Sequence, residues 1–280
     1  MNIKNVVVIG SGIMGSGIAA QLCNANVPVT LLDLKTEISE KAKKKIFESR
    51  PSLLIDKSKI NKIKVGNIEE NFDIVKKADW VVEAVVERID IKHNIYEKIL
   101  SKNPYHISAR YNLGMTHIKS NKLHKAIAEL NKAIQQNTRF AEGYYQRGNA
   151  YDETGNSLNA IDDYTQAISI NPNFVQALYN RGIVHAKIDL HDFAISDFNK
   201  VIRLRPTISN AYLNRGASLD EIGNHQAALD DYTMAINYNG TNVNAFFNRA
   251  KTLFLLGAFH DSICDYTYVI NSLPSDVEAL

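Results

Sequence analysis

Two different hydrophobic patterns divide the chain near residue 100. Before that point, short apolar, β-branched runs alternate with amphipathic stretches, which predicts parallel strands separated by helices. The runs that predict strands are NVVVIG at 5–10, VPVTLLD at 27–33, INKIKVGNI at 60–68 and DWVVEAVVE at 79–87. From residue 107 the apolar positions follow a helical period, and the sequence repeats every 34 residues. The chain therefore predicts an α/β segment followed by an all-α array.

Between the predicted strands, residues 37–62 and 70–78 are expected to be mostly helical. The first of these stretches carries a basic face. Its lysines are Lys41, Lys43, Lys44 and Lys45. A face exposed to solvent is the favoured interpretation, and a patch that binds phosphate is the alternative.

A glycine turn follows the first predicted strand. Gly10, Gly12 and Gly15 have the spacing G-x-G-x-x-G, a helix follows them, and Asp33 ends the second strand. The first glycine permits a tight turn, the second lets the backbone approach a pyrophosphate, and the third lets helix and strand pack closely. The helix N-terminus then offers free N–H groups to the phosphates. Asp33 is expected to bind the adenosine ribose and to favour NAD over NADP.

These segments resemble the NAD-binding domain of (S)-3-hydroxyacyl-CoA dehydrogenases. The resemblance is carried over residues 1–100 by VVVIGSGIMGSGIAAQL, VTLLDL and ADWVVEAVVERIDIKHNIYEKI. It implies a Rossmann-like half domain with strand order 3-2-1-4 and a possible NAD cofactor. The candidate cofactor-binding residues are Gly10, Gly12, Ile13, Met14, Gly15, Asp33, Ala84, Glu87 and Lys92.

The resemblance stops before the segment that carries the family's catalytic histidine. Of the eight histidines here, His93 lies on the helix after the fourth strand and the others lie in or beside the repeats. No histidine paired with a carboxylate is evident for hydride transfer to a 3-ketoacyl thioester. We therefore predict no catalytic residues and no dehydrogenase activity. Two alternatives are a dehydrogenase completed by a partner chain, and a fusion relic or chimera without coordinated function.

The 34-residue repeats resemble a tetratricopeptide repeat (TPR) array. Small residues recur at Gly114, Gly148, Gly182 and Gly216 in the first helices, and large residues recur at Leu130, Tyr164, Phe198, Tyr232 and Tyr266 in the second helices. A small residue in each first helix is expected to meet a small residue in the second, while the large residue fills the gap to the next hairpin. Five units are predicted over 107–276, and VEAL at 277–280 starts a sixth. The array implies an all-α superhelical solenoid over 107–280.

A ladder of carboxamides runs through the predicted units, two residues before each small residue. Its members are Asn112, Gln146, Asn180, Asn214 and Asn248. It resembles the asparagine ladder in the superhelical arm of protein O-linked N-acetylglucosamine transferases, which implies a concave groove for an extended peptide. A carboxamide has both a donor and an acceptor for a peptide backbone. The alternative is that asparagine merely suits this helix.

A second ladder combines arginines with acids on the paired helices. Its members are Arg147, Arg181, Arg215 and Arg249, with Glu129, Asp163, Asp197, Asp231 and Asp265. Paired charges between neighbouring helices are favoured over ligand binding.

Residues 96–106 are predicted to join the two modules, so that the NAD-binding half domain covers 1–95. YEKILSKNP at 96–104 aligns without a gap to YTQAISINP at 164–172. One helix can therefore run from the half domain into the array without a flexible linker. The predicted fourth strand lies at a sheet edge that this helix and the first repeat are expected to cover.

The formal net charge of +2 gives no electrostatic reason to expect nucleic acid or an anionic membrane as a partner. A protein partner or extended peptide is expected instead. Cys23 and Cys264 lie far apart without metal-ligand spacing, so no metal site is predicted and both are expected to be buried, reduced thiols. The N-terminal apolar run is too short for a signal peptide, and a cytoplasmic protein is expected.

Overall fold

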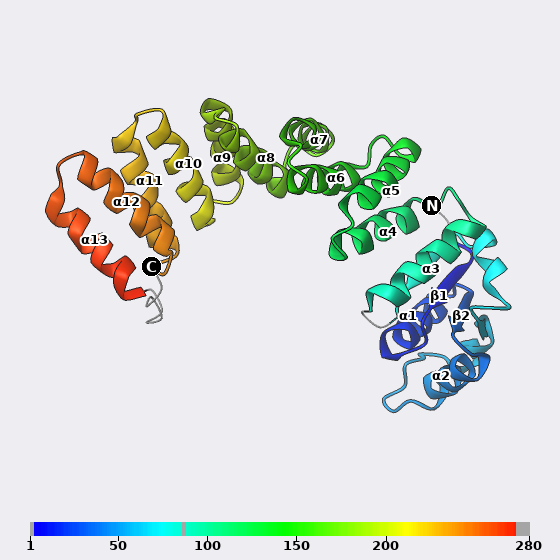
Figure 1. The fold of residues 1–280 in the computed structure, drawn as a ribbon. Coiled ribbons are helices and arrows are strands. Elements are labelled where there is room, and N and C mark those ends of the chain that lie inside the picture. Colours follow the sequence, from blue (N-terminus) through cyan, green and yellow to red (C-terminus); the bar gives the residue numbers. More distant parts are fainter. Residues whose placement is uncertain (1–2, 86–87, 273–280) are drawn as a thin grey trace, which may run out of the picture. The chain divides into compact units, whose positions relative to one another are not determined.

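A computed structural model describes residues 3–85 and 88–272, and the chain divides into two compact units, Met1–Gln136 and Asn137–Leu280. The first unit alternates strands and helices and then continues with three helices (Figure 1). Its elements are β1 Val6–Ile9, α1 Ile13–Asn24, β2 Val29–Asp33, α2 Thr36–Glu48, η1 Lys57–Lys62, β3 Ile63–Asn67, η2 Phe72–Lys77, β4 Trp80–Glu83, α3 Ile89–Lys102, α4 Ile107–Lys119 and α5 Leu123–Gln136.

The four strands form a parallel sheet in the order β3-β2-β1-β4, which confirms the predicted order. Successive residues of β1 face opposite sides of the sheet. Val6 and Val8 pack with α1 and α2, whereas Val7 and Ile9 pack with η2, α3 and α4. Because both faces are covered, the strands are continuously apolar rather than alternating.

The helical prediction for residues 37–62 is partly wrong. Helix α2 ends at Glu48, and regular structure resumes only with the 3-10 helix η1 at Lys57. Pro51 explains the interruption, because proline lacks an N–H donor and disfavours helical backbone at the preceding residue. The helix predicted over 70–78 is a short 3-10 helix, η2.

Helix α3 covers one face of the edge strand β4. Val81 of β4 packs against the cluster that contains Ile95 and Ile99 of α3, whereas Trp80 keeps 47% of its surface exposed. The expected cover is therefore partial: the face of β4 is packed, and Trp80 at the edge remains half exposed.

Helix α3 also packs against the first repeat, in the place that a second helix of a preceding repeat would take. It is one uninterrupted helix from Ile89 to Lys102, and a short turn separates it from α4. Tyr96 and Ile99 are buried together with Ala109 and Leu113 of α4. The domain limits predicted at residues 95 and 107 stay predictions of sequence organisation. In packing, α3, α4 and α5 belong to the same compact unit as the sheet.

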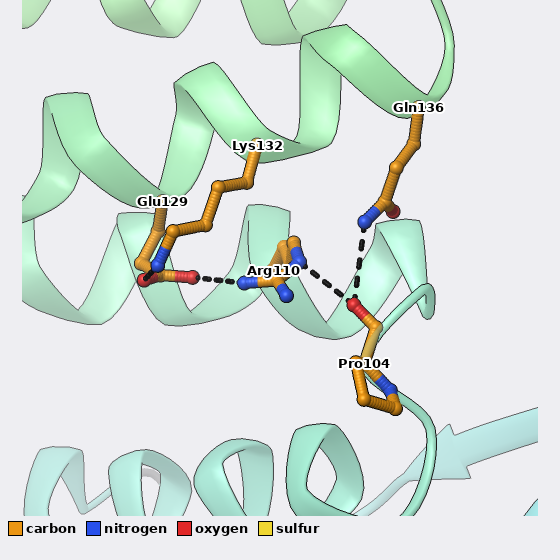
Figure 2. Close-up of polar contacts among 5 residues, drawn as sticks. All are labelled: Pro104, Arg110, Glu129, Lys132 and Gln136. Atoms are coloured by element: carbon orange, nitrogen blue, oxygen red, sulfur yellow. Dashed lines mark hydrogen bonds and ion pairs between the residues drawn. The ribbon is translucent and has the colours of Figure 1, made fainter.

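The turn between α3 and α4 is held by both helices of the first repeat pair (Figure 2). The carbonyl oxygen of Pro104 accepts hydrogen bonds from Arg110 Nε at 2.9 Å and Gln136 Nε2 at 3.3 Å. Arg110 also binds Glu129 at 2.8 Å, and Glu129 in turn accepts from Lys132 at 2.7 Å. The turn is therefore tied to the first and second helix of the pair.

The second unit consists, over its described residues, of antiparallel helix pairs. Its helices are α6 Ala141–Glu153, α7 Ser157–Ile170, α8 Val175–Lys187, α9 His191–Leu204, α10 Ser209–Glu221, α11 His225–Tyr238, α12 Val243–Leu255 and α13 Phe259–Ser272. The first helices begin 34 residues apart, as the repeat period predicts. Residues 277–280, where a sixth unit was expected to start, lie outside the described residues.

Each recurring glycine of the first helices lies under a large side chain from the second helix of its own repeat. A Cβ atom placed on Gly148, Gly182 or Gly216 would lie 2.8–2.9 Å from the ring of Tyr164, Phe198 or Tyr232, respectively. The glycine was expected to meet a small residue of the second helix. Its nearest neighbour is instead the buried aromatic ring of that helix, for which the missing side chain makes room. This contact sets the spacing of the two helices within each pair.

The second ladder forms ion pairs between the two helices of each repeat, as expected. The guanidinium groups of Arg147, Arg181, Arg215 and Arg249 each make two hydrogen bonds to the aspartate sixteen residues later. Arg181, Arg215 and Arg249 also donate to a polar side chain on the second helix of the preceding repeat. The ladder therefore links neighbouring repeats as well as the helices within one repeat.

We expect acid to destabilise the protein partly through Asp197. Burial alone would raise the pKa of Asp197, but hydrogen bonds from His185 and Arg181 outweigh burial and lower it. Because the folded pKa lies below the unfolded value of about 3.9, this contribution is complete above about pH 5 and is lost as the pH falls through the folded pKa. Asp197→Asn should therefore flatten the fall of unfolding free energy between pH 5 and pH 3 in urea titrations. An unchanged slope relative to the exposed control Asp192→Asn would contradict this prediction.

The two cysteines differ in exposure, so the expectation that both are buried is wrong for Cys264. Cys23 is buried in α1, where burial raises the pKa of its thiol, whereas Cys264 is exposed on α13. The repeat phase explains the difference. Equivalent positions in earlier repeats, Asp162, Ser196 and Asp230, are exposed as well.

Candidate functional site

A cavity of about 440 Å³ lies at the carboxyl edge of the sheet. Its wall includes Gly10, Ser11 and Gly12 of the glycine turn, together with Asp33 and Ala84 at the ends of β2 and β4. A second cavity of about 500 Å³ continues toward α3. The two cavities share the apolar residues Leu34, Ile68, Ile91 and Ile95. A polar glycine turn beside an apolar wall suits a nucleotide with phosphates and a flat base.

The three glycines of the turn have different structural reasons. Gly10 has φ of 99° and a Cβ there would lie 2.6 Å from the carbonyl oxygen of Ala84. A Cβ on Gly15 would lie 1.8 Å from the carbonyl oxygen of Gly10. A Cβ on Gly12 would meet nothing within 4 Å, and its φ of −64° suits any residue. The fold therefore requires Gly10 and Gly15, whereas the packing of the fold places no such demand on Gly12.

The N-terminus of α1 adjoins the cavity. The helix begins at Ile13, and its N-cap Gly12 makes no side-chain capping bond. The N–H groups of the first turn have no intrahelical acceptors and carry the positive end of the helix dipole. Ile13 and Met14 are 98% and 69% exposed, and their cofactor contacts remain predictions. This end of α1 suits a pyrophosphate.

The carboxylate of Asp33 is held by the glycine turn. Its Oδ2 atom accepts hydrogen bonds from the Ser11 backbone N–H at 2.7 Å and the Ser11 hydroxyl at 2.5 Å. Its Oδ1 atom accepts from the Leu34 N–H at 2.8 Å. Ser11 was not among the predicted site residues, although it lies between Gly10 and Gly12 in the sequence.

The remaining predicted contacts differ in their relation to the cavity. Ala84 lines the cavity, and its backbone N–H donates to Ile9. Lys92 does not line it, because its ammonium group lies 3.4 Å from Glu83, which also accepts a hydrogen bond from Tyr96. Glu87 lies outside the described residues. The cofactor contacts of Lys92 and Glu87 remain predictions.

Two lysines of the basic face border the cavity and are exposed to solvent, which agrees with the favoured interpretation of a solvated face. Lys41 and Lys45, together with Ile38 and Ala42, form the part of α2 that borders it. Their spacing in the sequence indicates that they lie together, because residues 38, 41, 42 and 45 fall on one face of a helix. Ala42 on that face is part of the core.

None of the eight histidines lines either cavity. Over the described ranges, no group of three or more His, Cys, Asp or Glu side chains is arranged to hold a metal ion. Within residues 3–85 and 88–272, no helix is both long enough and apolar enough to cross a membrane.

The carboxamide ladder is partly buried and partly engaged between repeats. Asn180 Nδ2 donates to Asn149 at 2.9 Å, and Asn214 Nδ2 donates to the Tyr179 hydroxyl at 2.9 Å. In the first repeat Asn112 is half-buried, and in the second repeat Gln146 donates to Glu142 of its own helix. Two of the five ladder amides, Asn180 and Asn214, therefore link successive repeats, and Asn248 is half-buried. The periodicity alone did not reveal this role.

The first segment of the chain matches the model of a known protein family. Residues 5–107 match the family model described as "3-hydroxyacyl-CoA dehydrogenase, NAD binding domain". The N-terminal segment is similar to the NAD-binding domain of 3-hydroxyacyl-CoA dehydrogenases. The match to this NAD-binding domain extends through α3 to the first residue of α4.

Relatives of the NAD-binding domain are considerably longer than this region. A probable 3-hydroxyacyl-CoA dehydrogenase of Deinococcus radiodurans is 39% identical over 106 residues, which cover 35% of this chain and 31% of that protein. A putative fatty acid oxidation complex trifunctional enzyme of Rickettsia felis is 40% identical over 105 residues, which cover 15% of its length. The chain thus spans less than a third of these relatives.

The repeat region matches TPR models and known TPR structures. Residues 141–174 match a tetratricopeptide repeat model, and residues 114–155 match a second TPR model. The crystal structure of MamA aligns with a TM-score of 0.53 and 28% identity, covering 54% of this chain and 89% of MamA. YrrB, described as "a TPR protein with an unusual peptide-binding site", aligns with a TM-score of 0.59 and 20% identity, covering 66% and 95%. The array therefore has the TPR fold.

Proposed function

We propose that this protein binds NAD, or its ADP portion, in the N-terminal unit and an extended polypeptide on the ladder face of the repeats. The single observation that carries the first half is Gly12. Its missing Cβ serves no packing purpose, and it lies between a cavity and an uncapped helix N-terminus. A pyrophosphate that approaches the backbone there accounts for both features.

The residues available fit binding better than hydride transfer. NAD supplies a hydride acceptor when bound, but transfer from a hydroxyacyl substrate also requires a base at the reacting carbon. No histidine borders either cavity. The protein is therefore proposed to use the nucleotide as a bound ligand. A dehydrogenase completed by a partner chain remains the competing function, since the relatives of this domain are named as dehydrogenases.

Calorimetric titration of NAD into the full-length protein tests the nucleotide half of the proposal. Saturable binding with one site per chain is expected. The same preparation is then mixed with acetoacetyl-CoA and NADH, and no oxidation of NADH at 340 nm is expected. Absence of saturable binding would refute the nucleotide function. Turnover by the protein alone would instead refute the prediction that this chain has no dehydrogenase activity.

The polypeptide half of the proposal depends on Asn180 and Asn214. Their Nδ2 atoms are used between repeats, so their Oδ1 atoms are the groups proposed to accept backbone N–H bonds from a ligand. YrrB supports this proposal by analogy of fold, since it is described as having a peptide-binding site. An acceptor ladder recognises the backbone of a peptide and reads little of its sequence.

Replacing both asparagines by alanine is expected to weaken peptide binding. Peptides are selected from a random 12-residue display library on the full-length protein, and their affinities are measured by fluorescence polarisation. Loss of two hydrogen bonds should weaken binding by about tenfold or more in the double variant. The control carries Asn159→Ala and Gln166→Ala, which change exposed amides on α7. Equal affinities of the wild type and the ladder variant would refute the role of the ladder.

A further inference from the structure

We propose that acid loosens the first repeat from the N-terminal half domain, because α4 is held against α3 only while His106 and His117 are neutral. His106 is the N-cap of α4, the first helix of that repeat, and His117 lies in its last turn. His93 of α3 faces His117 across the contact between the two helices. This regulation by pH is independent of the proposed nucleotide and peptide binding.

His117 is buried where α4 meets α3. It is 7% exposed, and its ring lies edge-on to that of His93, with the ring centroids 5.0 Å apart. Among the described residues, its Nδ1 atom has no hydrogen-bond partner. A protonated imidazole has an N–H donor on both ring nitrogens. Protonation of His117 in place would therefore bury a positive charge together with an unpaired donor, which is costly.

The cations around His117 also oppose its protonation. Burial is the first cause that lowers the pKa of His117. The charges of His93 on α3 and Lys125 on α5 lower this pKa further, as does Lys122 in the turn between α4 and α5. These groups approach from both helices that pack on α4 and from the turn that follows it.

Two carboxylates lie near this contact, and both are used elsewhere. Glu129 of α5 raises the pKa of His117, but its own carboxylate binds Arg110 at 2.8 Å and Lys132 at 2.7 Å. Glu97 of α3 lies 3.5 Å from the Nδ1 atom of the neighbouring His93. A proton on His93 is thus favoured by Glu97, and it places a second cation directly beside His117.

The third repeat provides a matched case in which the buried histidine has a carboxylate partner. His185 occupies the position of His117 two repeats later, and its Nδ1 atom lies 3.2 Å from Asp197. Asp197 is the equivalent of Glu129 in the first repeat. A protonated His185 therefore keeps a partner of opposite charge inside the array. The histidine at the contact with α3 has no such partner among the described residues.

His106 adds a second proton-sensitive contact at the other end of α4. Its Nδ1 atom accepts a hydrogen bond from the Ala109 N–H at 3.2 Å and so caps the helix. Only a neutral imidazole has a nitrogen that can accept, so protonation removes the cap. Burial lowers the pKa of His106. Ala109 is buried in the same cluster as Tyr96 and Ile99 of α3, so loss of the cap disturbs the packed end of α4.

The lowered pKa values of His106 and His117 set the direction of the effect. Each folded pKa lies below the unfolded value of about 6.5, so the unfolded chain binds more protons in the interval between the two values. The stability contributed by neutral histidines is therefore complete well above about pH 6.5. It is lost progressively as the pH falls from about 6.5 toward the folded pKa values.

Urea unfolding of the full-length protein, followed by the fluorescence of Trp80, tests the inference at about pH 7.5 and about pH 5.5. Trp80 is the single tryptophan and lies on β4, so its signal reports the N-terminal unit. The wild-type unfolding constant should rise about tenfold or more at the lower pH, since each unit of pKa difference contributes up to a factor of about ten.

The repeats themselves supply replacements for the two histidines. Asn242 is the N-cap of α12 in the position of His106 and accepts a bond from its own helix, and leucine stands in the position of His117 in the fourth and fifth repeats. A variant with His106→Asn and His117→Leu should fold, and its unfolding constant should change by less than about threefold. The control His124→Gln removes an exposed histidine of α5 and should keep the wild-type pH dependence.

Hydrogen exchange of the wild type, corrected for the intrinsic rate at each pH, locates the effect even if the double variant fails to fold. The amides of α4 should lose about tenfold or more of their protection at the lower pH. An unfolding constant that does not change with pH would overturn the inference. Equal pH dependence in the wild type and the double variant would overturn it as well, and so would unchanged protection of α4.

Discussion

Gly12→Val is expected to abolish NAD binding while the protein remains folded. The valine side chain would occupy the space where a pyrophosphate approaches the turn, so we expect a loss of at least about 100-fold in affinity, or about 2.7 kcal/mol. The folded protein should tolerate the change, because a Cβ at Gly12 meets nothing within 4 Å and the backbone φ is −64°. Calorimetry measures the binding, and thermal unfolding monitors the fold.

Two other glycines of the same helix provide the controls. Gly17→Val introduces the same side chain where a Cβ also meets nothing within 4 Å, but outside the cavity wall, so NAD affinity should be retained. Gly15→Val should unfold the N-terminal unit, because its Cβ would lie 1.8 Å from the carbonyl oxygen of Gly10. Normal NAD binding by Gly12→Val would show that the turn does not hold a pyrophosphate.

Arg215→Ala is expected to cost about 3 kcal/mol or more in the free energy of unfolding of the repeats. The substitution leaves the carboxylate of Asp231, which is 4% exposed, without the two hydrogen bonds that Arg215 supplies. It also removes the bond from Arg215 to Asn199 of the preceding repeat. Urea unfolding followed by circular dichroism measures the loss.

The comparison with less damaging variants separates a buried charge from a lost side chain. Arg203→Ala removes an exposed arginine from α9 and should change stability by less than about 0.5 kcal/mol. A combined Arg215→Met, Asp231→Leu variant should recover much of the loss, because no charge is then left buried without a partner. A small loss in Arg215→Ala would mean that Asp231 reaches solvent and that the ladder contributes little.

Prediction from the sequence succeeded where a local rule repeats or where several signals coincide. The 34-residue period fixes the positions of Gly148, Gly182 and Gly216 against their aromatic partners, and each repeat reinforces the assignment. The glycine turn was recognisable because a strand, a helix and Asp33 flank it at the required spacing. The helix predicted through residues 49–56 failed, because Pro51 interrupts a stretch whose composition otherwise suits a helix.

Other features of the site depend on contacts between distant segments. Lys41 and Lys45 were visible as a basic face, but only the packing of α2 on the core brings them to the wall of the cavity. Lys92 carries a predicted cofactor contact, yet in the folded chain it pairs with Glu83 at the end of β4. Amphipathic spacing defines which face of a helix is apolar and leaves open which partner that face meets.

The sequence by itself determined the two architectures and the residues of the glycine turn, because each follows from spacing along one segment, and the resemblance to the dehydrogenase family implied the strand order. Only the tertiary structure decided that α3 serves both architectures, packing on the sheet through Ile95 and on α4 through the cluster around Tyr96. It also decided that Ser11 donates hydrogen bonds to the carboxylate of Asp33 and that Asn180 and Asn214 bond to the preceding repeat. Such side-chain hydrogen bonds join residues from 22 to 35 positions apart, so their geometry depends on how whole helices and strands pack rather than on any local pattern.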